Sequence, residues 1–250
     1  MILQFVKGFG QVGNFGLRVL RHGLNRPFFW GQTVEQMHGM CFRCLIPVVT
    51  VLAPLGAVVS LQGLLILRIF GAEPLVSSLI AASIFRELSP GIASLMIAAQ
   101  AGSSIAAELA TMRVTSEIDA MEIMAVSPYR YLIMPRILAC IVVTPLLNVI
   151  GVVTGVLGGY LVAVKLRGVS HGAFMGNLYN FLDPMDLVQG LVKGAIFGFI
   201  ISLISSYNGF VATGGAEGVG RAANRSVVQS ILCILVANYF LTAAFLGTGS

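Results

Sequence analysis

Residues that could perform catalysis are few in this sequence, and they are scattered. The histidines, His22, His38 and His171, lie far apart, and none has a carboxylate at the spacing of a metal site. The sequence has one formal G-x-S-x-G, Gly168-Val169-Ser170-His171-Gly172, and such a motif positions a hydrolase nucleophile only on a turn between a strand and a helix. The sequence has no G-x-x-x-x-G-K-[ST] motif, so the chain lacks a P-loop of its own for a nucleotide. If ATP drives this protein, we expect a separate subunit to bind it.

Arg86 and Glu87 are the strongest candidates for an internal site, because they interrupt an otherwise apolar run. An unpaired ionisable side chain at the centre of a bilayer costs at least about 2.5–3.5 kcal/mol. We therefore expect the two residues to line a cavity or to have partners. The alternative is that they lie near the outer interface, where arginine extends its charged end to water. Glu108, near the inner end of the same run, is either a proton carrier or a hydrogen-bonded interfacial residue, and its position favours the second.

The composition of the chain places these charges in a membrane. Of 250 residues, 57% are hydrophobic and 10% are charged, and the mean hydropathy is +0.92. A soluble globular chain is about 25% charged. We therefore exclude a soluble enzyme and, despite the pI of about 9.3, a nucleic-acid-binding protein, and we predict an integral membrane protein without a nucleic-acid partner.

Five stretches without Asp, Glu, Lys or Arg are long enough to cross a bilayer, which takes roughly 20 apolar residues. None of them alternates as a β-barrel strand does. We predict a single all-α membrane domain over residues 1–250, in which the second span extends across Arg86 and Glu87. The predicted spans are 45–67, 75–110, 137–164, 194–216 and 226–248.

The segment before the first span has polar residues at steps of three and four, from Gln4 to Asn25, which is the pattern of one helical face. We predict an amphipathic interfacial helix over 1–27, ended by Pro27 and lying on the cytoplasmic leaflet. With the N-terminus inside, ten of the fifteen basic residues lie in cytoplasmic segments. The positive-inside rule therefore predicts a cytoplasmic N-terminus, and an odd number of spans places the C-terminus outside.

Small residues recur at every fourth position in two spans, and this spacing favours close helix packing in lipid. Because five spans leave limited room for an internal path, we expect a second copy of the chain to complete one. The small residues are Ser94, Ala98, Gly102, Ala106 and Ala110 in the second span, and Gly151, Gly155 and Gly159 in the third.

The loop between the second and third spans, 111–136, is longer than a tight turn requires. Ser116 resembles a helix N-cap, acidic residues follow it in the first turn, and Pro128 stops the helix. We predict a short helix over 116–127. It is either a plain surface helix or a lever that inserts into a groove of a soluble partner, and the length of the loop favours the lever. The residues expected on one face are Ile118, Met121 and Ala125.

Several short motifs follow one another along the chain. They are Arg86-Glu87-Leu88-Ser89-Pro90, Ala101-Gly102-Ser103, Ala106-Ala107-Glu108-Leu109-Ala110-Thr111-Met112, Glu117-Ile118-Asp119-Ala120-Met121-Glu122, Ser127-Pro128, Pro135-Arg136 and Gly218-Val219-Gly220-Arg221-Ala222. In this order they resemble the MlaE (YrbE-like) permeases of MCE-associated ABC transporters. The likeness covers nearly the whole chain, and the part from Arg86 to Arg136 is specific.

This resemblance implies a permease that moves phospholipids in the bacterial inner membrane. It implies a second permease copy, in a homodimer or a close heterodimer, a cytoplasmic ABC ATPase with or without a small regulatory subunit, and a periplasmic MCE-domain protein. The chain itself would hold no cofactor, because ATP and Mg would bind to the ATPase.

The resemblance also assigns roles by position. The loop helix is similar to the coupling helix that docks on the ATPase, and its residues are Glu117, Ile118, Asp119, Met121, Glu122 and Ala125. Arg86 and Glu87 match a charged pair beside the lipid chamber, where Arg86 would attract the phosphate and Glu87 would orient Arg86 or gate the dimer seam. The apolar wall of the chamber is matched by Val59, Leu61, Ile66, Leu67 and Phe70.

Three positions depart from the family pattern. Gln100 stands where the family commonly has Arg, which removes a charge. Ser89 and Ala125 stand where it commonly has Gly, and these changes bear on the helix kink and on the loop helix.

An apolar route suits a lipid. A diacyl lipid buries on the order of 30 methylenes, and exposing them to water would cost roughly 24 kcal/mol at about 0.8 kcal/mol each. We expect spans with almost no internal polar residues, which disfavours an ion or a sugar. The alternative is a proton-coupled transporter that uses Glu87 and Glu108, although five spans do not divide into equal inverted repeats. A membrane-embedded lipid-modifying enzyme would need convergent groups that the sequence lacks.

Overall fold

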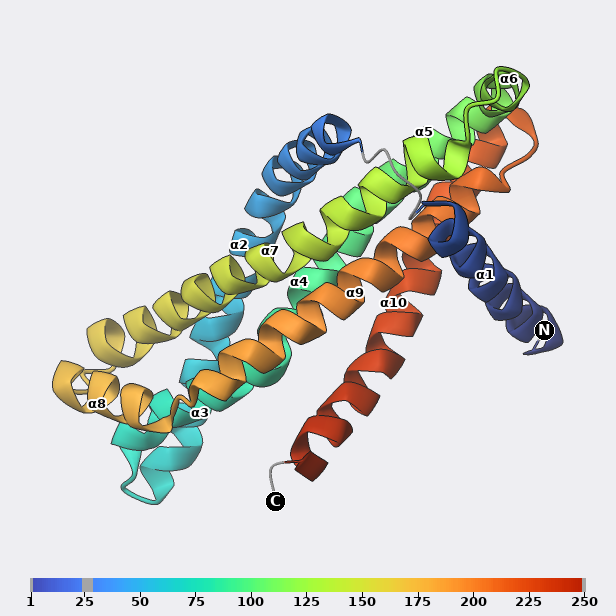
Figure 1. Ribbon diagram of the computed structural model, residues 1–250. Helices are drawn as coiled ribbons and strands as arrows, with labels where there is room; N and C mark the ends of the chain where they lie inside the picture. The colour runs from blue at the N-terminus through green and yellow to red at the C-terminus, as the bar shows by residue number, and fades with distance from the viewer. Residues whose placement is uncertain (1, 24–28, 249–250) are drawn as a thin grey trace. The chain divides into compact units, whose positions relative to one another are not determined.

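The computed structural model describes residues 2–23 and 29–248, and every regular element in them is helical (Figure 1). This confirms the predicted all-α membrane architecture. Helices suit such a chain because each backbone group finds its partner within the same segment. The five helical stretches of this part of the chain that are long and apolar enough to cross a membrane are Trp30–Ile69, Glu73–Val114, Tyr129–Leu166, Pro184–Phe210 and Gly215–Phe245.

The second and third of these stretches are built from several helical elements with π-helical turns among them. The elements are α1 (Ile2–Gly23), α2 (Trp30–Ile69), η1 (Glu73–Leu75), α3 (Val76–Ser83), η2 (Ile84–Leu88), α4 (Ser89–Ile97), η3 (Ala98–Gly102), α5 (Ser103–Val114), α6 (Glu117–Ile123), η4 (Tyr129–Ile133), α7 (Met134–Tyr160), η5 (Leu161–Leu166), α8 (His171–Phe181), α9 (Pro184–Phe210) and α10 (Gly215–Thr248). The four segments η2, η3, η4 and η5 are π-helical. Such turns occur frequently at functional sites.

The fourth membrane helix differs from the prediction. We expected a span over 194–216, whereas α9 runs from Pro184 to Phe210. The prediction required a run without charges, but Asp186 and Lys193 lie inside α9 and are buried. The chain then turns at Gly214, whose φ of +96° suits a residue without a side chain, and α10 begins at Gly215.

The N-terminal segment forms helix α1, as predicted. Its polar stripe is exposed at Gln11, Asn14 and Arg18, while Phe15 and Val19 are buried. The Phe15 ring lies 5.7, 5.6 and 5.7 Å from the rings of Tyr129, Tyr207 and Phe210. Residues 1 and 24–27 of the predicted 1–27 helix, including Pro27, lie outside the described residues.

Contacts within the chain divide it into two compact units. Unit 1 comprises Met1–Arg43, Ile97–Val143 and Ile196–Ile234, and unit 2 comprises Cys44–Met96, Thr144–Ala195 and Leu235–Ser250. All five long helical stretches contribute residues to both units.

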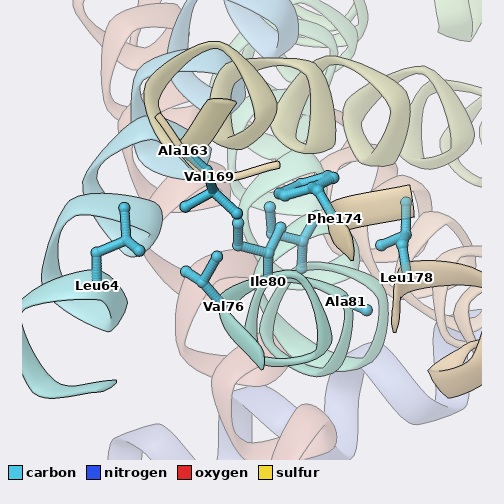
Figure 2. Packing of buried hydrophobic residues seen from close by; sticks show 9 residues of the cluster. Leu64, Val76, Ile80, Ala81, Ala163, Val169, Phe174 and Leu178 are labelled. Carbon is cyan, nitrogen blue, oxygen red and sulfur yellow. The ribbon is translucent and has the colours of Figure 1, made fainter. Parts of the chain in front are cut away.

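Unit 2 has an apolar core in which α3 packs against α8. Figure 2 shows Phe174 and Leu178 of α8 gathered with Val76 and Ile80 of α3, beside Leu64 of α2. The sequence reading did not predict α8. The cluster fixes η2, which follows α3 directly and carries Arg86 and Glu87.

The two stripes of small residues serve as helix contacts, as predicted. In unit 2, Gly155 of α7 lies so close to Gly56 of α2 that a Cβ at Gly56 would overlap the carbonyl oxygen of Gly155. In unit 1, a Cβ at Gly102 would meet Ser205 Oγ at 3.0 Å and Ile201 Cγ2 at 3.2 Å.

The expectation of almost no internal polar residues is wrong. In unit 1, serines of α9 and α10 are buried, and Ser226 donates a hydrogen bond to Ser205 at 2.7 Å. Asn208 donates to Gln229 at 2.8 Å. These paired hydroxyl and amide side chains satisfy one another or the preceding helical turn, so they fit an apolar helix without charge, whereas the hydroxyls of Ser206 and Ser230 have no partner in the described part of the chain.

Candidate functional site

Glu87 lies in the π-helical segment η2 of unit 2 and accepts hydrogen bonds from three side chains. Lys193 Nζ and Thr242 Oγ1 donate to its Oε1 at 2.9 and 2.8 Å, and Asn238 Nδ2 donates to its Oε2 at 2.9 Å. Lys193 is 2% exposed, so its charge depends on Glu87 for compensation. These donors come from α9 and α10, which are distant from η2 in the sequence.

Arg86, the neighbour of Glu87, pairs with Asp186 of α9. Its Nε and Nη2 donate to the two carboxylate oxygens at 2.8 and 3.1 Å, which is a bidentate arrangement. The guanidinium also lies 5.7 Å from the ring centre of Phe181. Lys193 Nζ joins the two pairs, since it donates to the Arg86 carbonyl at 2.8 Å. We call Arg86, Glu87, Asp186 and Lys193 the charged network.

The structure confirms that Arg86 and Glu87 have charged partners, and it corrects what those partners are. The expectation that Glu87 orients Arg86 is wrong, because Asp186 holds the guanidinium while Glu87 binds Lys193. The sequence analysis does not single out Asp186, and the predicted fourth span, 194–216, begins just after Lys193. Two charges at a spacing of seven residues on α9, facing two adjacent charges on η2, are the signal that could have revealed the network.

An apolar cavity of about 390 Å³ lies beside this network in unit 2. The cavity, which we call the apolar cavity, brings together three of the predicted site residues, Val59, Ile66 and Glu87. Its other lining residues are Gln62, Gly63, Leu79, Ser83 and Leu88. A carboxylate bound to an ammonium group thus stands at the edge of a wall of aliphatic side chains.

The other predicted wall residues lie elsewhere. Leu61 lines a separate small cavity with Arg68 and Arg167. Leu67 packs against the core cluster of α3 and α8, and Phe70 is 76% exposed beyond the end of α2. The assignment by position gave all five residues one role, whereas the structure brings Val59 and Ile66 together and separates the rest.

The loop helix α6 is shorter than the predicted 116–127. Ser116 precedes it in a left-handed conformation and makes no capping hydrogen bond through its side chain, and Ala125 follows it with φ +59°. Ala125 therefore does not share a helical face with Ile118 and Met121, as we had expected. A positive φ explains why glycine would fit position 125 well.

The side chains of α6 divide into a buried anchor and an exposed surface. Ile118 is fully buried and holds the helix to unit 1, and Asp119 pairs with Arg113. Ile123 and Met124 are 87% and 67% exposed, and the sequence reading had not singled them out. Of the other residues predicted to dock on the ATPase, Glu117 and Glu122 are exposed and Met121 is half-buried.

Glu108 of α5 lies in unit 1, where it accepts a hydrogen bond from Arg136 at 3.2 Å and lies 3.6 Å from Arg43. Ser104 also donates to it at 3.0 Å. Glu108 is thus ion-paired, in line with the hydrogen-bonded role that its position had favoured.

Ser89 and Gln100, the two residues of the second span that differ from the common family pattern, have different surroundings. Ser89 is buried and donates to the side chain and the carbonyl of Asn148 at 2.7 and 2.9 Å, so its hydroxyl ties η2 and α4 to α7. Gln100 is exposed in the π-helical segment η3.

Within residues 2–23 and 29–248, no group of three His, Cys, Asp or Glu side chains could hold a metal ion.

Comparison with known proteins agrees with this architecture. The sequence profile of the family described as Permease MlaE matches residues 33–244. The chain belongs to the MlaE permease family. A relative from Rickettsia felis, named probable ABC transporter permease protein, is 38% identical over 97% of this chain and 94% of its own length.

Two further relatives have more specific names. The intermembrane phospholipid transport system permease protein MlaE of Haemophilus influenzae is 32% identical over 99% of this chain and 95% of its own length. The chloroplastic protein TRIGALACTOSYLDIACYLGLYCEROL 1 of Arabidopsis thaliana is 30% identical over 93% of this chain and 65% of its own length.

Proposed function

We propose that this chain is the membrane-spanning subunit of an ABC transporter that moves phospholipids between the bacterial inner membrane and a periplasmic MCE-domain protein. The observation that carries this function is the apolar cavity of unit 2, which ends at the charged network. Aliphatic walls suit acyl chains, and a cluster of fixed charges suits a headgroup. The name of the Haemophilus relative supports the same substrate class.

In this function, Val59 and Ile66 contact acyl chains, and Arg86 faces the lipid phosphate. Asp186 holds the guanidinium of Arg86 bidentately, which fixes the orientation of that group. The Arg86 side chain remains 39% exposed and is therefore accessible to a lipid. The carboxylate of Glu87 pairs with the ammonium group of Lys193 inside the helices, so the pair carries no excess charge in the absence of lipid. Leu61, Leu67 and Phe70 would act in the lipid path outside the apolar cavity.

The energy comes from a separate cytoplasmic ATPase, which binds ATP and Mg and docks on α6. The exposed Ile123 and Met124 supply apolar contact area, and the carboxylates of Glu117 and Glu122 supply charge around it. The complex contains two permease copies, the ATPase with a small regulatory subunit, and the MCE-domain protein. The N-terminus lies in the cytoplasm and the C-terminus in the periplasm.

Lipid transfer by the reconstituted complex tests the site. We expect Glu87→Lys to abolish transfer between vesicles and to reduce the phospholipid that co-purifies, because a second cation beside Lys193 breaks the charged network. Lys165→Glu, a charge reversal at an exposed residue of the same unit, is the matched control and should retain both. Unchanged lipid occupancy in Glu87→Lys would remove the charged network from the lipid site.

The docking of the ATPase is tested separately. Ile123→Asp and Met124→Asp should each lower the ATPase that co-purifies by about tenfold, since truncating a central apolar contact costs about 1–2 kcal/mol or more. Tyr179→Asp, which changes a residue that is 75% exposed on α8, is the control. Transfer driven by a pH gradient without ATP would instead support the proton-coupled alternative through Glu87 and Glu108.

A further inference from the structure

A second cavity, of about 310 Å³, lies wholly within unit 1, between the first third of α2 and α5. Its lining differs from that of the apolar cavity, because ionisable groups of both signs face it: Glu35 and Arg43 from α2, and Glu108 from α5. Met40 and Ile105 supply its apolar part. We call it the mixed-charge cavity.

The two signs of charge are held in fixed positions. Arg43 Nη1 donates to Ser104 Oγ at 2.8 Å and lies 3.6 Å from Glu108 Oε1. The other oxygen of Glu108 accepts from Arg136 Nη2 at 3.2 Å. Glu35, by contrast, has no ion-pair partner within residues 2–23 and 29–248.

Behind Glu108 the structure contains donors without acceptors. Arg136 is 5% exposed, and its Nε and Nη1 have no hydrogen-bond partner in the described part of the chain. Buried guanidinium donors are nearly always paired in native proteins. Arg136 itself does not line the cavity, so Arg43 is the guanidinium that an anionic oxygen could reach there, and Glu35 has capacity for a cation.

We infer that the mixed-charge cavity binds the headgroup of a zwitterionic phospholipid, with the phosphate toward Arg43 and the ammonium toward Glu35. This site rests on the phospholipid function proposed above and narrows its substrate class. A headgroup that carries both charges satisfies both sides of the cavity. A purely anionic headgroup would leave Glu35 unpaired and place like charges side by side.

The surface beside the cavity suits a lipid better than a soluble zwitterion. Val34 and Phe42 of α2 are 60% and 63% exposed, and their spacing of eight residues places them on one side of the helix. His38 lies between them in the sequence and packs against Phe42 with its ring tilted by 48°, at 4.6 Å between the ring centres. An acyl chain along this stripe would cover apolar surface while the headgroup occupies the cavity.

Photo-crosslinking in a defined bilayer tests this site. Gly39 lines the cavity, and a Cβ there meets no atom within 4 Å, so a diazirine-bearing amino acid fits. The full-length chain carrying it is placed in nanodiscs of equimolar phosphatidylethanolamine and phosphatidylglycerol, and the adducts are identified by mass spectrometry. Position 31, another open glycine on α2, reports the background.

We expect position 39 to capture phosphatidylethanolamine about tenfold over phosphatidylglycerol, as one added charge-assisted contact predicts. Glu35→Gln should abolish this preference without lowering total capture, and Arg43→Gln should lower capture of both lipids. Glu217→Gln, an exposed carboxylate of unit 1 outside the cavity, should change neither. Native mass spectrometry of the chain without the diazirine should show the same dependence on Glu35.

Equal capture of the two lipids, or a preference that survives Glu35→Gln, would overturn the inference. Loss of lipid adducts in excess glycerophosphoethanolamine would overturn it too, since the cavity would then take a soluble compound. A diazirine at position 66, in the apolar cavity, distinguishes failure of this inference from failure of the proposed function. Capture at 39 without capture at 66 refutes the apolar cavity as the lipid site, and the reverse refutes the mixed-charge cavity.

Discussion

Lys193 shows how a single buried side chain can decide whether a carboxylate is tolerated inside an apolar helix bundle. It donates to Glu87, to Thr242 and to the Arg86 carbonyl, so the three hydrogens of its ammonium group all have acceptors. With Asp186 and Arg86, the network contains two positive and two negative groups. The charges therefore cancel locally, which lowers the cost of holding them in the helices.

Lys193→Met should destabilise the protein by about 1–3 kcal/mol, because Glu87 and the Arg86 carbonyl lose a charged donor. Thermal unfolding of the detergent-solubilised chain, followed with a thiol-reactive dye at its buried cysteines, measures this loss. Adding Glu87→Gln should recover part of it, since the unpaired carboxylate is then gone. Strictly additive losses in the two single variants and the double variant would show that the residues are not coupled.

The contact between Arg86 and Asp186 depends on the planar shape of the guanidinium group as well as on its charge. Arg86→Lys retains the charge but loses one of the two parallel hydrogen bonds. We expect lipid transfer by the complex to fall while the phospholipid content changes little. Arg68→Lys, which alters an exposed pair with Glu73, is the control. Full activity of Arg86→Lys would mean that charge alone is needed.

Among the helical elements, sequence patterns predicted the long helices well and their ends poorly. Hydropathy identified α2 and α7 because their apolar runs exceed the bilayer thickness. It failed at α9, since Asp186 and Lys193 look like loop residues until their partners on η2 are known. The helix α8 was missed because its apolar residues, Phe174 and Leu178, pack on α3, a contact that no local pattern encodes.

The left-handed conformation of Ala125, just after the end of α6, can be tested by substitution. Ala125→Gly should stabilise the protein by about 1 kcal/mol, because a left-handed φ costs a residue with a Cβ about 1–2 kcal/mol. Ala120→Gly, on the exposed side of α6, should destabilise by about 1 kcal/mol, because glycine weakens a helix interior. Thermal unfolding of both variants decides the matter, and shifts of the same sign would contradict the conformation at 125.

The contact between α2 and α7 in unit 2 gives a second test. Gly56→Ala should cost about 1–3 kcal/mol, because its Cβ would overlap the backbone carbonyl of Gly155, which cannot rotate away. Gly91→Ala, where no atom lies within 4 Å of the new Cβ, should be neutral or stabilising. If both variants unfold at the same temperature as the unaltered chain, the close approach of the two backbones is wrong.

At the scale of the whole molecule, the sequence identified the class and the family but not the sites. Composition and span length sufficed for an all-α membrane protein, and motifs from Arg86 to Arg136 sufficed for the family. The pairing of η2 with α9 and α10, and the mixed charge on α2 and α5, depend on contacts between segments far apart in the chain. Local periodicity carries no information on such contacts, because they form only when the chain is folded.

The orientation of the molecule is the remaining prediction at this scale. Arg136 and Lys193 are buried and do not act as loop charges, which leaves nine basic residues on the N-terminal side and four on the other. Nine against four favours a cytoplasmic N-terminus, and five membrane helices then place the C-terminus in the periplasm. Alkaline phosphatase fused after residue 250 should be active, and green fluorescent protein fused there should be dark. A fusion after Val126, in the α6 loop, is the internal control and should behave oppositely, because in the proposed complex that loop docks on the cytoplasmic ATPase. The same reporter activity at both positions would contradict either the number of crossings or the side on which α6 lies.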